Sequence, residues 1–278
     1  MQIITDSASD LPIELAEKLD ITVVPMQIEI DGIGYQDGID LFHRDFYEKM
    51  NRSKNLPKTS QPSTGSFIEA YKKALEKDND VLSIHMSSKI SGTFNGASMA
   101  AKQLGQNIRL FDSLSGTMGT GLMVLNAAQM RNNGLSTSEI ISNLETLQSN
   151  VKVIGYLDSL KNAVKGGRVK PSKRFVTELM NVKPITSIEN GNVEVIHAVR
   201  GKEKAHKYIA KIIGDSAKEL EKKQIAIVHC DAEDNAKRLD QIIKDQIGDM
   251  DTIITTMGPV NSTHVGTGGI SVCVALTN

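Results

Sequence analysis

The fold is constrained most by residues 81–97, VLSIHMSSKISGTFNGA. The first six, Val81 to Met86, are mostly apolar and indicate a short buried strand. Ser91, Gly92 and Thr93 indicate a helix start, with a hydroxyl as the cap and a glycine that lets another backbone approach. Because the first helix amides lack partners and carry the positive end of the dipole, this strand end suits a carboxylate or a phosphate. Taken alone, the turn is better explained as an ordinary helix cap.

Similar turns recur in the first half of the chain. Residues 4–9 (ITDSAS) and 110–115 (LFDSLS) share an Asp-Ser-x-Ser turn after an apolar run, and residues 58–63 (KTSQPS) precede another predicted helix. Strands that alternate with helices predict an α/β fold with largely parallel sheets, whose ligands lie beyond the carboxyl ends of the strands. We therefore expect a polar crevice with few charges, suited to hydrogen-bonding a small anionic group.

The length of 278 residues fits either one large domain or two smaller ones. We predict two α/β domains, residues 1–150 and residues 151–278, because a new strand-like run starts at Val151. Ahead of it, residues 116–130 (GTMGTGLMVLNAAQM) are apolar on nearly every face and predict a buried helix. Its small residues leave room for neighbouring side chains or for an alkyl chain, and core packing is the default interpretation.

Composition and motifs exclude several classes of function. A net charge of −1, no Trp and 4% aromatic residues argue against a nucleic-acid-binding surface. The chain has no GxxxxGK[ST] motif and no GxGxxG after its first strand, so we expect no nucleotide cofactor. It also lacks HExxH and paired Cys or His zinc motifs, and we expect no metal site.

The cysteines and the N-terminus bear on the cellular compartment. Cys230 and Cys273 lie in apolar surroundings and predict buried free thiols rather than a disulfide. The first residues lack the basic and apolar regions of a signal peptide, and no apolar run is long enough to span a membrane. We predict a cytoplasmic protein without an integral membrane segment.

Two further features of the second half carry alternative interpretations. His264 follows an apolar strand in a glycine-rich stretch, which we interpret as a loop. Its ring either bonds a neighbouring carbonyl or donates to a carboxylate in the crevice, and the spacing does not decide between these. Six cations between Lys161 and Arg174, without an intervening acid, form either a solvated face or a patch for a phosphate or an acidic partner.

Six segments, in order along the chain, resemble motifs of the DegV family, and together they are specific. They are TDSASDLP (5–12), TSQPS (59–63), SSKISGTFNGA (87–97), FDSLSGTMGTG (111–121), YLDSLKNAVKGGR (156–168) and GPVNSTHVGTGG (258–269). The resemblance implies a DegV-like fold of two α/β domains with a fatty acid enclosed between them. One departure is Thr267, where the family often has proline.

The resemblance also implies roles for individual residues. Thr59 and Ser91 are expected to hold the fatty acid carboxylate with the helix amides at Gly92, and His264 is expected to join this network. Arg168 and Arg200 are expected to lie near the surface where a phosphoryl group is transferred.

The function implied is that of a carrier without catalytic residues or cofactors of its own, as in the FakB subunit of bacterial fatty acid kinase. It would bind a long-chain fatty acid and present the carboxylate to a separate ATP-dependent, FakA-like kinase subunit for acyl-phosphate formation. The alternative is a lipid ester hydrolase with Ser91 as nucleophile and His264 and Asp112 as partners, although no GxSxG motif is present. For ligand exchange we expect residues 161–173 to act as the element that moves.

Overall fold

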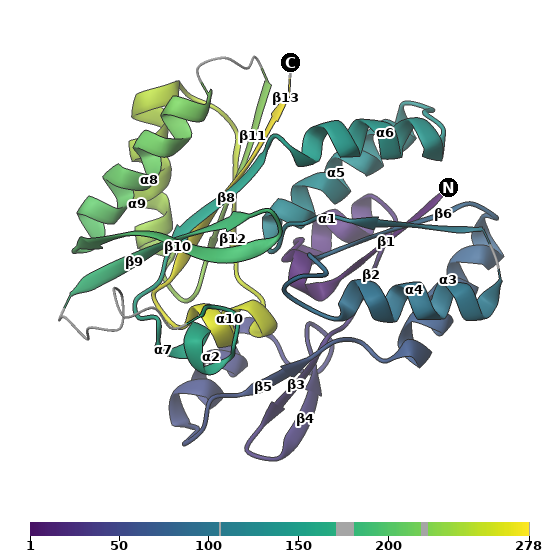
Figure 1. Ribbon diagram of the computed structural model, residues 1–278, viewed down its shortest axis with the longest axis horizontal. Coiled ribbons are helices and arrows are strands. Elements are labelled where there is room, and N and C mark those ends of the chain that lie inside the picture. The colour runs from purple at the N-terminus through teal and green to yellow at the C-terminus, as the bar shows by residue number, and fades with distance from the viewer. Residues whose placement is uncertain (106, 171–180, 218–221, 278) are drawn as a thin grey trace.

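A computed structural model describes residues 1–105, 107–170, 181–217 and 222–277 of the chain. It has a mixed α/β architecture with two main sheets and one small sheet (Figure 1). The first sheet is entirely parallel and has the strand order β2-β1-β6-β7. Its strands are β1 (Gln2–Asp6), β2 (Ile21–Val24), β6 (Val81–His85) and β7 (Ile108–Asp112). The α/β class and the parallel sheet flanked by helices are thus confirmed.

Helices cover both faces of the first sheet. The side chains of α3 and α4 form one apolar cluster with the sheet, centred on Phe67 and Tyr71, and those of α1, α5 and α6 pack against the other face. The helices are α1 (Ile13–Lys18), α3 (Thr64–Lys77), α4 (Thr93–Leu104), α5 (Met118–Asn132) and α6 (Thr137–Gln148), and the short 3-10 turn η1 spans Ser7–Ser9.

The second sheet differs from the predicted largely parallel arrangement. Its order is β10-β9-β8-β13-β11-β12, and within the described residues β11 and β12 form its one parallel pair. A tight turn at Asn190 and Gly191, both with positive φ, makes β9 and β10 an antiparallel hairpin. The last strand then inserts between β8 and β11 and runs antiparallel to both. The strands are β8 (Val151–Tyr156), β9 (Val182–Glu189), β10 (Asn192–Arg200), β11 (Lys222–His229), β12 (Thr252–Thr256) and β13 (Ile270–Thr277).

Helices α8 (Lys202–Ala217) and α9 (Glu233–Ile247) cover one face of the second sheet, as Figure 1 shows. Helix α5 packs against the other face and is therefore buried between the two main sheets. A Cβ at Gly119 would lie 2.4 Å from Val153, so the small residues of α5 serve close packing of protein against protein. The default interpretation of this helix, core packing, is confirmed.

Two shorter elements differ from the sequence interpretation. Residues 21–30 are rich in β-branched residues, which favour a strand, but the structure divides them at Pro25 into β2 and β3, which belong to different sheets. His264 lies in the last turn of a short helix rather than in a loop, because Pro259 suits a first helical position and Gly266 ends the helix. The remaining elements are β3 (Gln27–Ile30), β4 (Ile33–Gln36), β5 (Lys58–Ser60), α2 (His43–Arg52), α7 (Lys161–Lys165) and α10 (Pro259–Val265).

Other expectations concern the chain as a whole. Cys230 and Cys273 are free and buried, as predicted. Among the described helices, none is both long and apolar enough to cross a membrane. The boundary at residue 150 falls between α6 and β8, and the division into two domains stays a prediction.

Candidate ligand site

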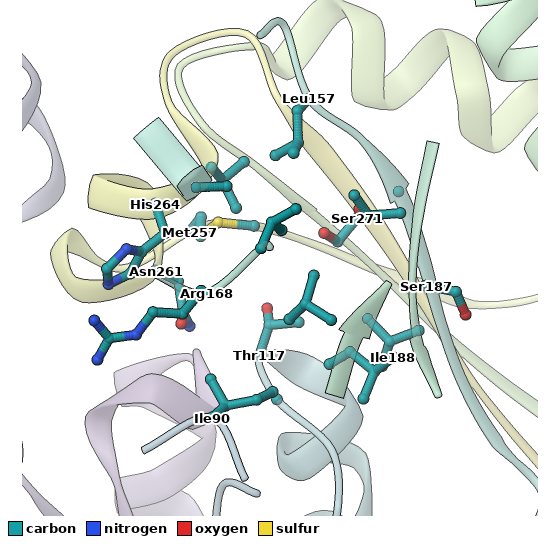
Figure 2. Close-up of a pocket in the computed structure, with 18 of the residues that line it drawn as sticks. Ile90, Thr117, Leu157, Arg168, Ser187, Ile188, Met257, Asn261, His264 and Ser271 are labelled. Atoms are coloured by element: carbon teal, nitrogen blue, oxygen red, sulfur yellow. The ribbon is translucent and has the colours of Figure 1, made fainter. Parts of the chain in front are cut away.

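A cavity of about 100 Å³ lies between the two main sheets. Its wall is built by β8, β9, the start of β13, the N-terminus of α5, α7 and α10 (Figure 2). Most of its lining side chains are apolar, among them Val153, Leu157 and Ile188. In Figure 2 the polar side chains of Arg168 and His264 lie on the side away from Ile188. One side of the cavity thus suits a charged group and the rest suits a hydrocarbon chain.

His264 lies at the polar side and is held by Thr59. The His264 Nε2 atom is 3.0 Å from Thr59 Oγ1, although the two residues are 205 positions apart. Strand β5 carries Thr59 and contacts α10 directly. The sequence-predicted pair is therefore brought together by the packing of the small sheet against α10.

The environment of His264 keeps its ring neutral. Burial, and then the nearby charge of Arg168, lower the pKa of His264 to about 4. Its Nδ1 atom is buried without a hydrogen-bond partner and faces the backbone of Gly166, where an added Cβ would be 2.3 Å away. Because an orphaned N–H is rarer than an underused acceptor, we assign the proton to Nε2. His264 then donates to Thr59, and the Thr59 hydroxyl proton is free to point at a ligand carboxylate.

Ser91 and Gly92 lie near this pair, but among the described residues neither forms a hydrogen bond to Thr59 or His264. Ser91 Oγ is 2.8 Å from Thr93 Oγ1 and accepts the Thr93 N–H at 3.3 Å. The capping position of α4 is Gly92 rather than Ser91, which corrects the predicted cap. Gln61, two residues after Thr59, presses on Gly92 so closely that a Cβ there would lie 1.8 Å from its Oε1. This contact joins the strand end of Thr59 to the helix start of Ser91.

Neither Thr59, Ser91 nor Gly92 lines the cavity itself, whereas Ile90 does. The backbone from Ile90 to Gly92 thus runs from the cavity wall to the contact with Gln61. The predicted carboxylate seat therefore lies at the margin of the cavity, next to its polar side.

The two predicted arginines occupy different places. Arg168 is half-buried, lines the cavity and donates from Nη1 to Gly166 O at 2.7 Å. Arg200 is exposed at the end of β10 and does not line the cavity. The structure therefore places Arg168 with His264 and leaves Arg200 apart. Lys173 and Arg174 of the basic run, and the end of the predicted moving segment, lie outside the described residues.

The groups named for a hydrolase are not assembled. His264 contacts Thr59, Ser91 contacts Thr93, and Asp112 Oδ1 accepts the backbone N–H groups of residues 88 and 114. A Ser-His-Asp chain does occur at Ser83, His85 and Asp6, with distances of 2.6 and 2.9 Å. All three of these residues have 0% exposure, so a substrate has no access to them and the chain serves the core.

Sequence reasoning missed the polar groups beneath the cavity. Thr117 and Asn261 both line it, and both donate to the buried carboxylate of Asp10. Asn261 lies within the GPVNSTH segment and Thr117 within the FDSLSGTMGTG segment, so both segments were signals for this place. No cluster of three or more metal-ligating His, Cys, Asp or Glu side chains occurs among the described residues.

Comparisons with known proteins agree over the whole chain. A family model described as "Uncharacterised protein, DegV family" matches residues 1–277. A DegV domain-containing protein of Staphylococcus aureus is 32% identical over 274 residues, which cover 98% of this chain and 97% of the relative. A solved structure of a DegV family protein from Thermus thermophilus, described as binding fatty acid, superimposes with a TM-score of 0.93 at 29% identity and covers 99% of both chains. DegV of Bacillus subtilis, described as a fatty acid binding protein, gives a TM-score of 0.90 at 29% identity, again with 99% of both chains.

Proposed function

This chain belongs to the DegV family, and from that membership and its cavity we propose that it binds a long-chain fatty acid. The observation that carries the proposal is the Thr59–His264 pair at the polar side of an apolar-lined cavity. This pair suits one carboxylate, because neutral His264 donates to Thr59 and leaves the Thr59 hydroxyl to donate to the ligand, without the desolvation cost of a buried cation.

The apolar wall of the cavity supports an alkyl chain as the other part of the ligand. A volume of about 100 Å³ holds several small groups in a row, since one water needs ~10–15 Å³ of such space. Each methylene buried there contributes about 0.8 kcal/mol.

We further propose that the protein is a carrier rather than an enzyme, and that an ATP-dependent, FakA-like kinase subunit phosphorylates the bound carboxylate. Arg168, at the polar side of the cavity, would neutralise the acyl phosphate, and the exposed Arg200 would face the kinase. Two free and buried cysteines fit a reducing compartment, which supports a cytoplasmic location.

Native mass spectrometry of the purified protein tests the ligand. We expect a mass increment of one long-chain fatty acid, lost on delipidation and restored by palmitate. A protein that stays empty and takes up no palmitate would overturn the proposal.

The kinase role has a separate test. With the partner kinase and ATP, we expect Arg168→Ala and Arg200→Ala to abolish acyl-phosphate formation while palmitate stays bound. An exposed cation on helix α3, Lys73→Ala, serves as the control, because it does not line the cavity. Loss of palmitate binding in these variants, or acyl-phosphate formation that persists in them, would show that the arginines have the wrong role in this scheme.

A further inference from the structure

A buried carboxyl group, Asp10, lies beneath the polar side of the cavity and takes no part in lining it. Its Oδ2 atom accepts from Thr117 Oγ1 at 2.5 Å and from Asn261 Nδ2 at 2.8 Å, and both of these residues line the cavity. Its Oδ1 atom accepts the N–H of Gly258 at 2.8 Å, at the start of α10. One side chain thus joins the N-terminus of α5 to the helix that carries His264.

The backbone at Thr117 shows that this arrangement holds a residue under strain. Thr117 has φ 48° and ψ −147°, a conformation that a β-branched residue rarely adopts. Such outliers persist where the surroundings over-determine them, and they gather at ligand sites. The short bond to Asp10 is the contact that holds the Thr117 side chain, and the neighbouring Gly116 also lines the cavity.

A second buried acid, Asp37, supports the same helix start. It accepts the backbone N–H of Val260 and the hydroxyl of Ser7. A Cβ at Gly258 would lie 2.9 Å from Asp10 Oδ1 and 3.6 Å from both Asp37 oxygens, so the two carboxyl groups meet at this glycine. Burial raises the pKa of Asp37 to about 8 and that of Asp10 to about 7. Asp10 accepts from three donors and Asp37 from two. We therefore assign the negative charge of this carboxyl pair to Asp10 and leave Asp37 protonated.

We propose that Asp10 is a positioning residue of the ligand site. It holds Thr117 and Asn261 in the wall and fixes the start of α10, and through this seven-residue helix it sets where the His264 ring stands. The inference rests on the proposed function, since it assumes that the Thr59 hydroxyl, oriented by His264, receives a carboxylate.

Asp10→Asn provides the test, because the amide keeps the shape but turns its N–H₂ group toward a donor, either the N–H of Gly258 or the side chains of Thr117 and Asn261. In delipidated protein, we expect palmitate affinity to fall roughly tenfold or more, the cost of misplacing a donor to a charged group. The affinity for 1-hexadecanol, which has the same chain without the carboxylate, should change less than about threefold. A merely structural role would weaken both ligands equally, and that result would overturn the proposal.

A second readout needs no ligand. The ring nitrogen resonances of His264 in the empty protein should shift in Asp10→Asn, because the helix that carries the ring has moved. Asp112→Asn is the control: this aspartate, at the end of β7, accepts two backbone N–H groups, and neither it nor those two residues line the cavity. Unchanged His264 resonances in Asp10→Asn would overturn the proposal. If Asp10→Asn does not fold, Thr117→Val removes one of the three donors and is measured in the same way.

The two proposals fail in different ways. If the wild-type protein binds neither palmitate nor hexadecanol, the proposed function is refuted, while the resonance shift still tests the role of Asp10. If wild-type protein and the Asp10→Asn variant bind palmitate equally well, only the positioning role of Asp10 is refuted.

Discussion

Replacing Thr59 by valine should weaken fatty acid binding and leave the fold intact. Valine keeps the shape of threonine and removes the hydroxyl that lies 3.0 Å from His264 Nε2. A hydrogen bond to a charged group contributes about 1.5–3 kcal/mol, so the loss corresponds to a roughly 10- to 150-fold weaker affinity for palmitate. His264 also loses its partner at Nε2 and, with Nδ1 already unpartnered, keeps no hydrogen bond on its ring.

Isothermal titration calorimetry of delipidated protein with palmitate measures this effect. Ser60→Ala is the control, because this exposed residue follows Thr59 on the same strand and its side chain alternates to the other face. The variants His264→Phe and Thr59→Val with His264→Phe complete a double-mutant cycle. If the two residues act as one unit, the double variant should fall short of the sum of the single effects by more than about 0.5 kcal/mol. Additive effects, or a Thr59→Val affinity within about threefold of wild type, would refute the reasoning.

Three other substitutions test the packing of the site and its buried charge. Gly92→Ala should push Gln61 aside, because its Cβ would lie 1.8 Å from the amide oxygen, and calorimetry should show at least a roughly tenfold loss of palmitate affinity. Gly166→Ala should displace the His264 ring, because the added Cβ would lie 2.3 Å from His264 Nδ1, and this should change the His264 ring resonances in the empty protein. Asp37→Asn concerns stability: the folded pKa of about 8 lies above the unfolded value of 3.8, so the contribution of Asp37 is complete below pH 3.8 and is lost as pH rises through 8. The introduced asparagine does not titrate, so the free energy of unfolding of the variant does not fall with pH in this way. Between pH 5 and 7.5 the difference in unfolding free energy, variant minus wild type, should therefore rise by up to about 1.4 kcal/mol per pH unit. A difference that stays constant with pH would contradict the assignment.

The sequence predicted much of the first sheet because three of its strands, β1, β6 and β7, carry a local signal. Apolar runs at 2–5 and 81–86 end in polar turns and are followed by helices, and this alternation leads to parallel pairing. The second sheet could not be derived in the same way. Whether the last strand joins an edge or inserts between β8 and β11 depends on which edges remain free after the other elements pack, and no local pattern encodes that.

The candidate site was predicted in part for a related reason. The hydroxyl-rich turns were readable from residue types, but spacing alone left His264 undecided between a loop contact and a ligand contact. The resemblance to the DegV family named Thr59 and His264 as partners, and the packing of β5 against α10 brings them within 3.0 Å. Asp10 lies in the TDSASDLP segment, but its role had no local signal, because the burial that changes its chemistry comes from Thr117 and from α10, both more than 100 residues away.

Glycines show most clearly what a sequence reveals about such a site and what it withholds. A glycine signals that another group approaches the backbone closely, and three glycines of the site do meet such a group. The side chain of Gln61 approaches Gly92, that of His264 approaches Gly166, and that of Asp10 approaches Gly258. Each approaching side chain belongs to a distant segment, so the glycine marks the position of a contact without naming its partner. Substitution at these glycines therefore tests tertiary contacts that residue patterns alone do not identify.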